Sequence, residues 1–277
     1  MPPTVPSDIA KLVTFSLQED VGTGDITAEL IPIEKTISAK LISRDTGVFC
    51  GRPWADEVIQ QVDSSLRVNW NIEEGGELTP DQTLAQITGS ARSILTAERT
   101  VLNFLQTLSA VSTISQHYAS LVRHTSVKLL DTRKTLPSLR SAQKYAVRIG
   151  GCFNHRMGLF DAFLIKENHI VACGGIDAAI AKAKALYPNK PVEIEVQNLT
   201  ELELAISAQA DIVMLDNFDH GNTVKAVELN GERLKLEASG GIDADMLVSI
   251  AETGVDYISL GALTKNCQAT DLSLLIE

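Results

Sequence analysis

The segment Val192–Val196 reads VEIEV, and its alternation decides between the two folds that the rest of the chain allows. A strand with this sequence carries Glu193 and Glu195 on one face and three branched apolar residues on the other. The strands of a doubly wound sheet are covered by helices on both faces and are apolar throughout. Two carboxylates on one face therefore indicate a barrel strand that faces a polar interior.

Residues 234–239 show the same parity, because alternation places Lys235, Glu237 and Ser239 on one face. Short apolar runs of this kind recur between helical patterns and predict a parallel sheet. The runs are 127–130, 162–165, 192–196, 212–215, 234–238 and 257–260, and the helical patterns are 138–149, 176–187, 199–209, 221–229 and 244–253. Only six repeats fit, so we expect an incomplete α/β barrel with fewer than eight strands.

The first third of the chain has a different pattern of predicted strands and helices. Residues 36–43 and 65–72 resemble short strands, and residues 73–76 and 88–90 have turn chemistry. From Ser93 onward, leucines at helical spacing predict a long helix near 93–121. The pattern indicates a small α+β module that precedes the barrel.

Charge is distributed unevenly along this acidic chain. The formal net charge is −11, yet residues 127–170 carry +5, so the remainder carries −16. An acidic protein is a poor general binder of nucleic acids or anionic membranes. The cationic segment instead predicts a site for a small, strongly anionic ligand.

Compartment and redox state follow from composition. No apolar stretch approaches a membrane span, and residues 1–11 lack the basic start and apolar run of a signal peptide, so we expect a cytoplasmic protein. The four cysteines are scattered, with no C-x-x-C pair and no histidine at metal-ligand spacing. We expect four free thiols.

Each predicted barrel strand ends in polar residues, and barrel enzymes build their sites at the carboxyl ends of the strands. These residues are Asp131 with Arg133 and Lys134, Lys166 with Asn168 and His169, Glu195 with Gln197, Asp216 with Asn217, Ser239 with Gly240 and Gly241, and Gly261. The two glycine loops follow the last strands, where barrels commonly bind a phosphate on backbone N–H groups.

Several roles remain open from residue chemistry alone. Glu195 and Asp216 suit Mg²⁺ or a developing positive charge, or else a salt bridge inside the barrel to Lys166 or Lys235. Arg133 can grip a carboxylate or phosphate with two hydrogen bonds. Lys166 suits either Schiff-base chemistry or a clamp for an anion.

Ten motifs resemble the quinolinate phosphoribosyltransferase family, the decarboxylating nicotinate-nucleotide pyrophosphorylases of NAD biosynthesis. They are EDVGTGDIT (19–27), AERTVLNFLQ (97–106), LDTRKTLPSLR (130–140), KYAV (144–147), NHRMGL (154–159), LIKENHI (164–170), VEIEVQN (192–198), DIVMLDNF (211–218), EASGGI (237–242) and DYISLGALT (256–264). The resemblance covers nearly the whole chain. It implies an open α+β sandwich domain at 1–122, an incomplete barrel at 123–266, and a C-terminal segment, 267–277, that returns to the first domain.

The resemblance also implies residue roles, position by position. Arg133, His155, Arg156 and Lys166 would bind the two carboxylates of quinolinate, helped by Arg99 from the partner in a homodimer. Lys134 and His169 would face the pyrophosphate of phosphoribosyl pyrophosphate, and Glu195 and Asp216 the ribose and Mg²⁺. Ser239, Gly240, Gly241 and Gly261 would hold the 5′-phosphate. Catalysis would rest on Lys134, Lys166, Glu195 and Asp216.

The chain departs from the family pattern at three places. Ser138 and Cys152 stand where the family often has glycine, and Lys265 stands where it often has a histidine. We assign Lys265 to the phosphate. The rival functions are a related phosphoribosyltransferase for a monocarboxylate such as nicotinate, a Schiff-base aldolase built on Lys166, and a non-catalytic phosphosugar-binding module.

Overall fold

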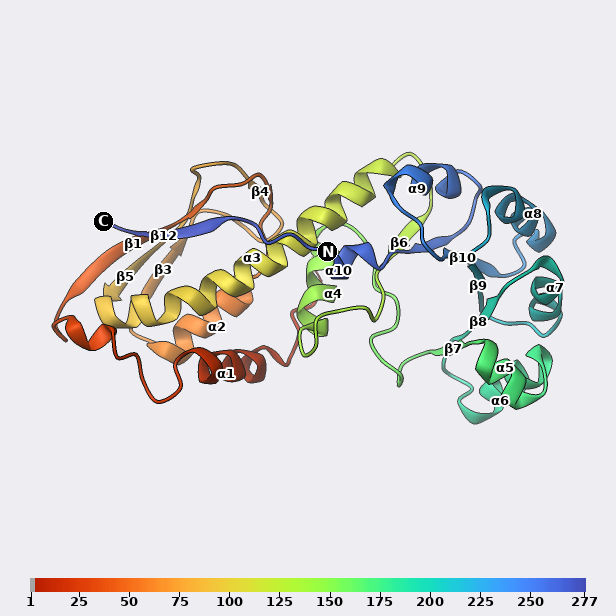
Figure 1. The fold of residues 1–277 in the computed structure, drawn as a ribbon, viewed down its shortest axis with the longest axis horizontal. Helices are drawn as coiled ribbons and strands as arrows, with labels where there is room; N and C mark the ends of the chain where they lie inside the picture. Colours follow the sequence, from red (N-terminus) through yellow and green to blue (C-terminus); the bar gives the residue numbers. More distant parts are fainter. Residues whose placement is uncertain (1–2) are drawn as a thin grey trace. The chain divides into compact units, whose positions relative to one another are not determined.

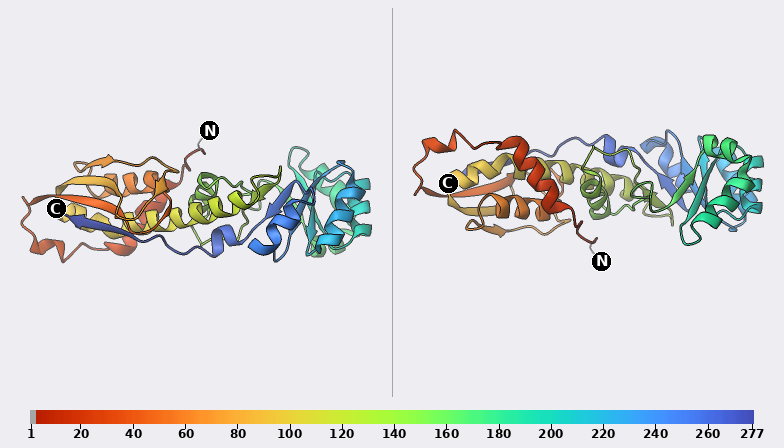
Figure 2. Two further views of the ribbon diagram at one scale, coloured as in Figure 1. Left: turned by 90° about the horizontal axis from the view of Figure 1, so that it is seen from above. Right: turned by 90° about the horizontal axis from the view of Figure 1, so that it is seen from below.

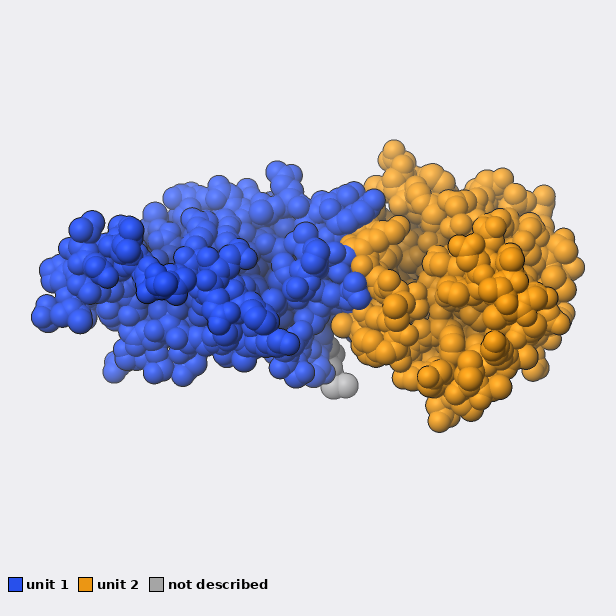
Figure 3. All heavy atoms as spheres, turned by 60° about the horizontal axis from the view of Figure 1, so that its bottom comes forward, with its two compact units in different colours: residues 1–117, 135–151, 263–277 blue, residues 118–134, 152–262 orange. Residues whose placement is uncertain are grey.

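The computed structural model describes residues 3–277. Its chain divides into two compact units, coloured separately in Figure 3. The first unit comprises the chain up to His117 with residues 135–151 and 263–277, and the second comprises residues 118–134 and 152–262. Residues 135–151, which were expected within the barrel domain, thus form most of their contacts in the first unit.

The first unit contains a four-stranded antiparallel sheet in the order β12-β1-β5-β3. Its strands are β1 (Thr36–Ser43), β3 (Arg67–Trp70), β5 (Thr83–Ser90) and β12 (Leu272–Ile276), and β2 (Gly47–Val48) pairs separately with β4 (Glu77–Leu78). β12 lies against β1 with Leu41 opposite Leu274. The last residues of the chain therefore complete a sheet that begins near its start.

The expected turn at residues 88–90 is wrong, because β5 continues through Ser90. Gly89 is present for packing: a Cβ at this position would lie 2.6 Å from Cδ2 of Leu66. A glycine within a strand often marks such a close approach rather than a chain reversal.

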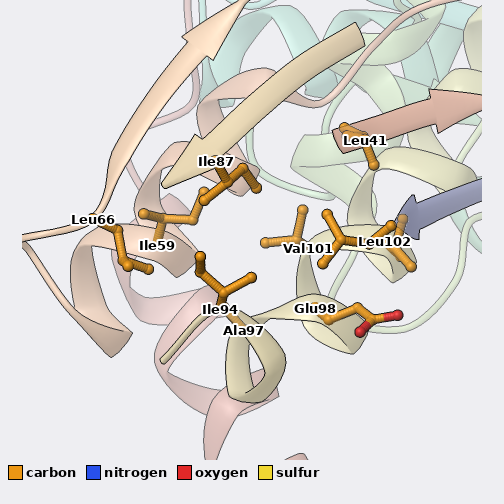
Figure 4. A pocket seen from close by; sticks show the side chains of 10 residues that line it. Leu41, Ile59, Leu66, Ile87, Ile94, Ala97, Glu98, Val101 and Leu102 are labelled. Carbon is orange, nitrogen blue, oxygen red and sulfur yellow. The ribbon is translucent and has the colours of Figure 1, made fainter. Parts of the chain in front are cut away.

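Helices α2 (Arg52–Val62) and α3 (Ala91–Leu121) pack against this sheet (Figures 1 and 2). The unit also contains α1 (Ile9–Asp20) and α4 (Arg140–Ile149), with the short η1 (Ala28–Leu30) and α10 (Ala262–Lys265). The predicted long helix is confirmed as α3. In Figure 4 the apolar side chains of Leu41, Ile87, Ile59 and Ile94 converge on a small gap, and the carboxylate of Glu98 points away from it.

The second unit contains a six-stranded parallel sheet in the order β6-β11-β10-β9-β8-β7. Its strands are β6 (Lys128–Leu130), β7 (Phe163–Ile165), β8 (Val192–Val196), β9 (Ile212–Asp216), β10 (Lys235–Ser239) and β11 (Tyr257–Ser259). An isolated parallel bridge joins Leu130 of β6 to Phe153. The end strands β6 and β7 are not neighbours in the hydrogen-bonded order, so the prediction of an incomplete barrel with fewer than eight strands is confirmed.

Helices line the outside of this sheet (Figure 2). They are α5 (Glu167–Cys173), α6 (Ile176–Leu186), α7 (Leu199–Ser207), α8 (His220–Asn230) and α9 (Ala244–Ala251). Asn198, Asp219 and Asp243 each accept hydrogen bonds from backbone N–H groups in the first turn of the following helix. These N-caps end the loops that leave the carboxyl ends of β8, β9 and β10, and so fix where the strand-end residues lie.

The cysteines and the helices agree with what the composition predicted. All four cysteines are free thiols, and Cys50 and Cys152 are buried. Among residues 3–277, no helix combines the length and apolarity needed to cross a membrane.

Candidate active site

The barrel interior is polar, as the strand alternation predicted. Glu193 on β8 and Glu237 on β10 are almost completely buried, at 3% and 0% exposure. Between them lies the imidazole of His155, whose Nε2 is 2.8 Å from Oε2 of Glu193 and 3.4 Å from Oε2 of Glu237. One buried ring thus contacts two buried carboxylates.

Charge and burial oppose each other in this cluster. Burial by itself would lower the pKa of His155, but the hydrogen bond to Glu193 and the nearby carboxylate of Glu237 outweigh that effect and raise the pKa to about 10. Burial raises the pKa of Glu193, the hydrogen bond from His155 counteracts it, and the charge of Glu237 adds to the rise. The arrangement strongly favours the imidazolium form of His155.

Asp131 holds His155 in this position. Asp131 directly follows β6 and is completely buried. Its carboxylate accepts hydrogen bonds from the backbone N–H of His155 at 2.9 Å and from Nδ2 of Asn154 at 2.6 Å. Its own N–H donates to the carbonyl of Phe153 at 3.0 Å. The strand-end carboxylate is therefore a structural clamp that holds the segment carrying His155 and Arg156.

Arg133 lies close enough to Arg156 for its charge to act on the Arg156 guanidinium group. Burial and then the charge of Arg133 lower the pKa of Arg156, while Glu193 and Asp161 oppose the shift. The carboxylate of Asp161 accepts hydrogen bonds from the N–H groups of Met157 and Gly158, at 2.7 and 3.0 Å, and closes the loop that follows Arg156. Two guanidinium groups kept together in this way attract an anion with more than one negative charge.

Glu195 and Asp216 form an acidic pair at the ends of β8 and β9, beside two lysines. Lys166 forms an ion pair with Glu195. Burial and the charge of Glu195 raise the pKa of Asp216, whereas Lys166 and Lys134 lower it. The four residues predicted to be catalytic therefore share one electrostatic environment.

The salt bridge considered for the acidic pair exists between Glu195 and Lys166. Lys235 instead pairs with Asp256 at 2.6 Å, at the amino end of β10. His169 is exposed in the first turn of α5, where its Nδ1 accepts a hydrogen bond of 3.0 Å from the backbone N–H of Lys166. Because Nδ1 accepts this bond, a neutral His169 ring carries its hydrogen on Nε2. Nε2 is therefore the nitrogen that can contact a ligand.

The loop after β10 has a compact backbone. Gly240 has φ +100°, and a Cβ there would lie 2.2 Å from Oδ1 and 2.8 Å from N of Asn217. Gly241 has φ +61°, and a Cβ at this residue would meet no atom within 4 Å. The hydroxyl of Ser239 accepts a hydrogen bond of 3.0 Å from the hydroxyl of Ser259. The loop is open at Gly241, as binding of a phosphate on the backbone requires, and Gly261 follows β11 at the same end of the sheet.

Two predicted site residues belong to the first unit. Arg99 is exposed on α3 and, within the described part of the chain, makes no hydrogen bond or ion pair. Lys265 is exposed at the end of α10. Their roles toward a ligand stay predictions.

Sequence reasoning missed the partners of His155. It placed Glu193 and Glu237 on interior faces but assigned neither to a site, and it treated Asp131 as one strand-end residue among several. The alternation of residues in β8 and β10, which places both glutamates on the interior face, was the available indication. It could not be connected to His155, because that residue lies outside every predicted strand.

The second unit defines an α/β-barrel protein whose strand ends gather cations, an acidic pair and open glycine loops for an anionic ligand. Residues 25–109 match the family model described as quinolinate phosphoribosyl transferase, N-terminal domain, and residues 111–275 match that of the C-terminal domain. The chain belongs to the quinolinate phosphoribosyl transferase family. The predictions of family and fold class are confirmed.

Named relatives agree with this assignment. The chain is 37% identical over 267 residues to a probable nicotinate-nucleotide pyrophosphorylase [carboxylating] of Bacillus subtilis, covering 96% of this chain and 92% of the relative. It is 37% identical to quinolinate phosphoribosyltransferase [decarboxylating] 1b of Nicotiana tabacum, covering 100% of this chain and 85% of the relative. The solved nicotinate-nucleotide pyrophosphorylase of Francisella tularensis is 49% identical, with a TM-score of 0.94 over 100% of this chain and 99% of that one. The predicted enzyme class is confirmed.

Proposed function

We propose that this protein transfers the phosphoribosyl group of phosphoribosyl pyrophosphate to quinolinate and removes one carboxylate, giving nicotinate mononucleotide, pyrophosphate and CO₂. One observation carries the proposal: the guanidinium group of Arg133 acts on that of Arg156, the residue that directly follows the imidazolium of His155. Such a cluster suits a dicarboxylate. The acidic pair and the open glycine loop in the same unit suit the second substrate.

The residues divide by the ligand group that each contacts. Arg133, His155, Arg156 and Lys166 bind the two carboxylates of quinolinate, and Arg99 of a partner subunit joins them. Lys134 and His169 face the pyrophosphate. Ser239, Gly240, Gly241, Gly261 and Lys265 hold the 5′-phosphate. Glu195 and Asp216 face the ribose and bind Mg²⁺.

The donor set of Glu195 and Asp216 fits Mg²⁺, which prefers carboxylate oxygens and retains several waters. Burial and then the charge of Glu195 raise the pKa of Asp216, so the two carboxylates repel each other, and a divalent cation that they bind would relieve that repulsion. When bound, Mg²⁺ supplies positive charge that neutralises the pyrophosphate.

The chemistry needs no covalent bond to the enzyme. The bond between ribose C1 and pyrophosphate breaks, the oxygen takes the electron pair, and the ammonium group of Lys134 stabilises the added charge. Glu195 and Asp216 stabilise the positive charge that develops on the ribose while the pyridine nitrogen attacks C1. The nitrogen is then quaternary, so the adjacent ring carbon can keep the electron pair when its carboxylate leaves as CO₂. Protonation of that carbon completes the reaction.

A homodimer is the expected assembly. Asp25 holds the segment before η1 against α3 by accepting a hydrogen bond of 2.9 Å from Thr96, one helical turn before Arg99. Ile26 in this segment and Leu30 at the end of η1 are 82% and 84% exposed. Neighbouring exposed apolar side chains favour a protein contact, which would bring the unpaired Arg99 close to a partner. The cytoplasmic location remains a prediction.

The rivals are disfavoured by the same geometry. A Schiff-base lysine must react as the neutral amine, whereas the side chain of Lys166 is 50% exposed and its ammonium group pairs with Glu195. A monocarboxylate such as nicotinate would leave part of the cationic cluster uncompensated. A non-catalytic phosphosugar-binding module would give the acidic pair no role.

Incubation with quinolinate, phosphoribosyl pyrophosphate and Mg²⁺ tests the proposal. We expect CO₂ and a mononucleotide in equal amounts, and none of either from Arg133→Ala protein that retains its fold. Turnover of nicotinate in preference to quinolinate, or wild-type activity of the Arg133 variant, would contradict the assignment.

A further inference from the structure

Glu193 and Glu237 surround His155 with more negative charge than a single hydrogen bond requires. Oε1 of Glu193 and both carboxylate oxygens of Glu237 are buried and, among the described residues, make no hydrogen bond. A buried carboxylate without full hydrogen bonding destabilises the folded state, and apolar residues of similar volume often fill such a position at no loss of stability. The second carboxylate therefore does not serve the fold alone.

The two carboxylates fix the chemistry of the ring. Both can only accept hydrogen bonds when ionised, so the Nε2 that lies between them carries the proton. This contact fixes the ring orientation, because Glu193 is on β8, Glu237 is on β10, and the backbone of His155 is held by Asp131 near β6. Three parts of the barrel thus determine the position of one imidazole.

Glu193 also acts on the neighbouring guanidinium groups. Its charge opposes the effect of Arg133 on Arg156. Glu193 therefore offsets part of the repulsion between the two arginines, in addition to its contact with His155.

We propose that Glu193 and Glu237 are positioning residues for the pyridine dicarboxylate: they hold the imidazolium of His155 in the orientation that binds the substrate. This inference rests on the proposed function, because it assumes that His155 contacts the substrate. Neither carboxylate contacts the substrate itself, and both act through the ring.

A double-mutant cycle tests whether the carboxylates act through His155. The proteins are wild type, His155→Gln, Glu237→Gln and the double variant, with titration calorimetry of quinolinate and, separately, of phosphoribosyl pyrophosphate with Mg²⁺. We expect Glu237→Gln to weaken quinolinate binding by about tenfold, the range for a lost charge-assisted interaction, and to leave phosphoribosyl pyrophosphate binding unchanged. In the His155→Gln background the same substitution should have no further effect. Exposed Glu228, on α8, supplies the matched control Glu228→Gln.

Two results would overturn the inference: equal weakening of both ligands, or additive effects of the two substitutions. If Glu237→Gln does not fold, Glu193→Gln closes the same cycle. NMR of the histidine side chains gives a readout that needs no ligand. We expect the ring of His155 to carry protons on both nitrogens in the wild type and to lose this state in the carboxylate variants, and an unchanged ring would contradict the positioning role. Absence of quinolinate binding by the wild type with the expected ring state would instead refute the proposed function.

Discussion

Asp131 and His155 are joined by a hydrogen bond of 2.9 Å between the carboxylate of the first and the backbone N–H of the second, across 24 residues of sequence. This bond holds the backbone of His155 next to the end of β6. Because Asp131 is completely buried, an amide NH₂ in place of one carboxylate oxygen would face a donor and have no acceptor. The positions of His155 and the adjacent Arg156 therefore depend on a buried carboxylate far earlier in the sequence.

We expect Asp131→Asn to lower the free energy of unfolding by about 1–3 kcal/mol, the range for a buried donor left unsatisfied, and also to weaken quinolinate binding. Chemical denaturation and calorimetry measure the two effects. Asp211→Asn is the control, because Asp211 accepts a backbone hydrogen bond of 2.7 Å from Val192 at the amino end of β8. It should lose stability without a change in quinolinate affinity, and the same binding loss in both variants would contradict the clamp role.

Ser138 has φ +64°, the left-handed conformation that glycine adopts without strain. This explains why the family often has glycine there. We expect Ser138→Gly to stabilise the protein by about 1 kcal/mol in chemical denaturation, since the relieved strain exceeds the added flexibility of the unfolded chain. Ser249→Gly, within helix α9, should destabilise it by about 1 kcal/mol. A loss of stability in the Ser138 variant would refute the argument.

Gly240 and Gly241 permit a test that separates folding from phosphate binding. A Cβ at Gly240 would collide with Asn217, whereas a Cβ at Gly241 would meet nothing within 4 Å. We expect Gly240→Ala to lower both the melting temperature and the affinity for phosphoribosyl pyrophosphate. Gly241→Ala should lower the affinity while costing only the left-handed strain of about 1–2 kcal/mol. Unchanged affinity in the Gly241 variant would exclude a phosphate at this loop.

Periodicity was sufficient for most of the fold. The residues of β1 and β8 were predicted to the residue, and the alternation in β8 correctly indicated a polar interior. Helix α5 escaped prediction because its seven residues are too few to show a helical repeat.

The strand-end rule located the site but not the direction of its side chains. Arg133, Lys166 and Asp216 lie at the predicted edge, whereas Asp131 turns inward. That difference is decided by a partner far along the chain, which no local pattern reveals. Arg99 and Lys265 were named from family resemblance, and local sequence contains no physical reason to select them.

The raised pKa of His155 predicts how its contribution to stability changes with pH. A group whose pKa is higher in the folded state stabilises the fold below its unfolded pKa, about 6.5 for histidine. The contribution is lost as the pH rises toward the folded value of about 10. The difference in unfolding free energy between wild type and His155→Gln should thus shrink steadily from about pH 6.5 to about 9.5. A difference that is constant or grows over this range would show that His155 is neutral when folded.

Arg99 allows a test of a shared active site. It is exposed on α3, and no described residue pairs with it. We expect Arg99→Ala and Arg156→Ala to be folded and nearly inactive as separate proteins. If each site takes Arg99 from the partner and Arg156 from its own chain, a mixed dimer contains one site with both arginines intact. Mixing the variants should then restore up to about a quarter of wild-type activity by random assortment. A mixture of Arg133→Ala with Arg156→Ala is the control and should stay inactive, because both residues come from one chain. No recovery despite subunit exchange, confirmed by mass spectrometry of differently tagged chains, would show that Arg99 does not act across a dimer.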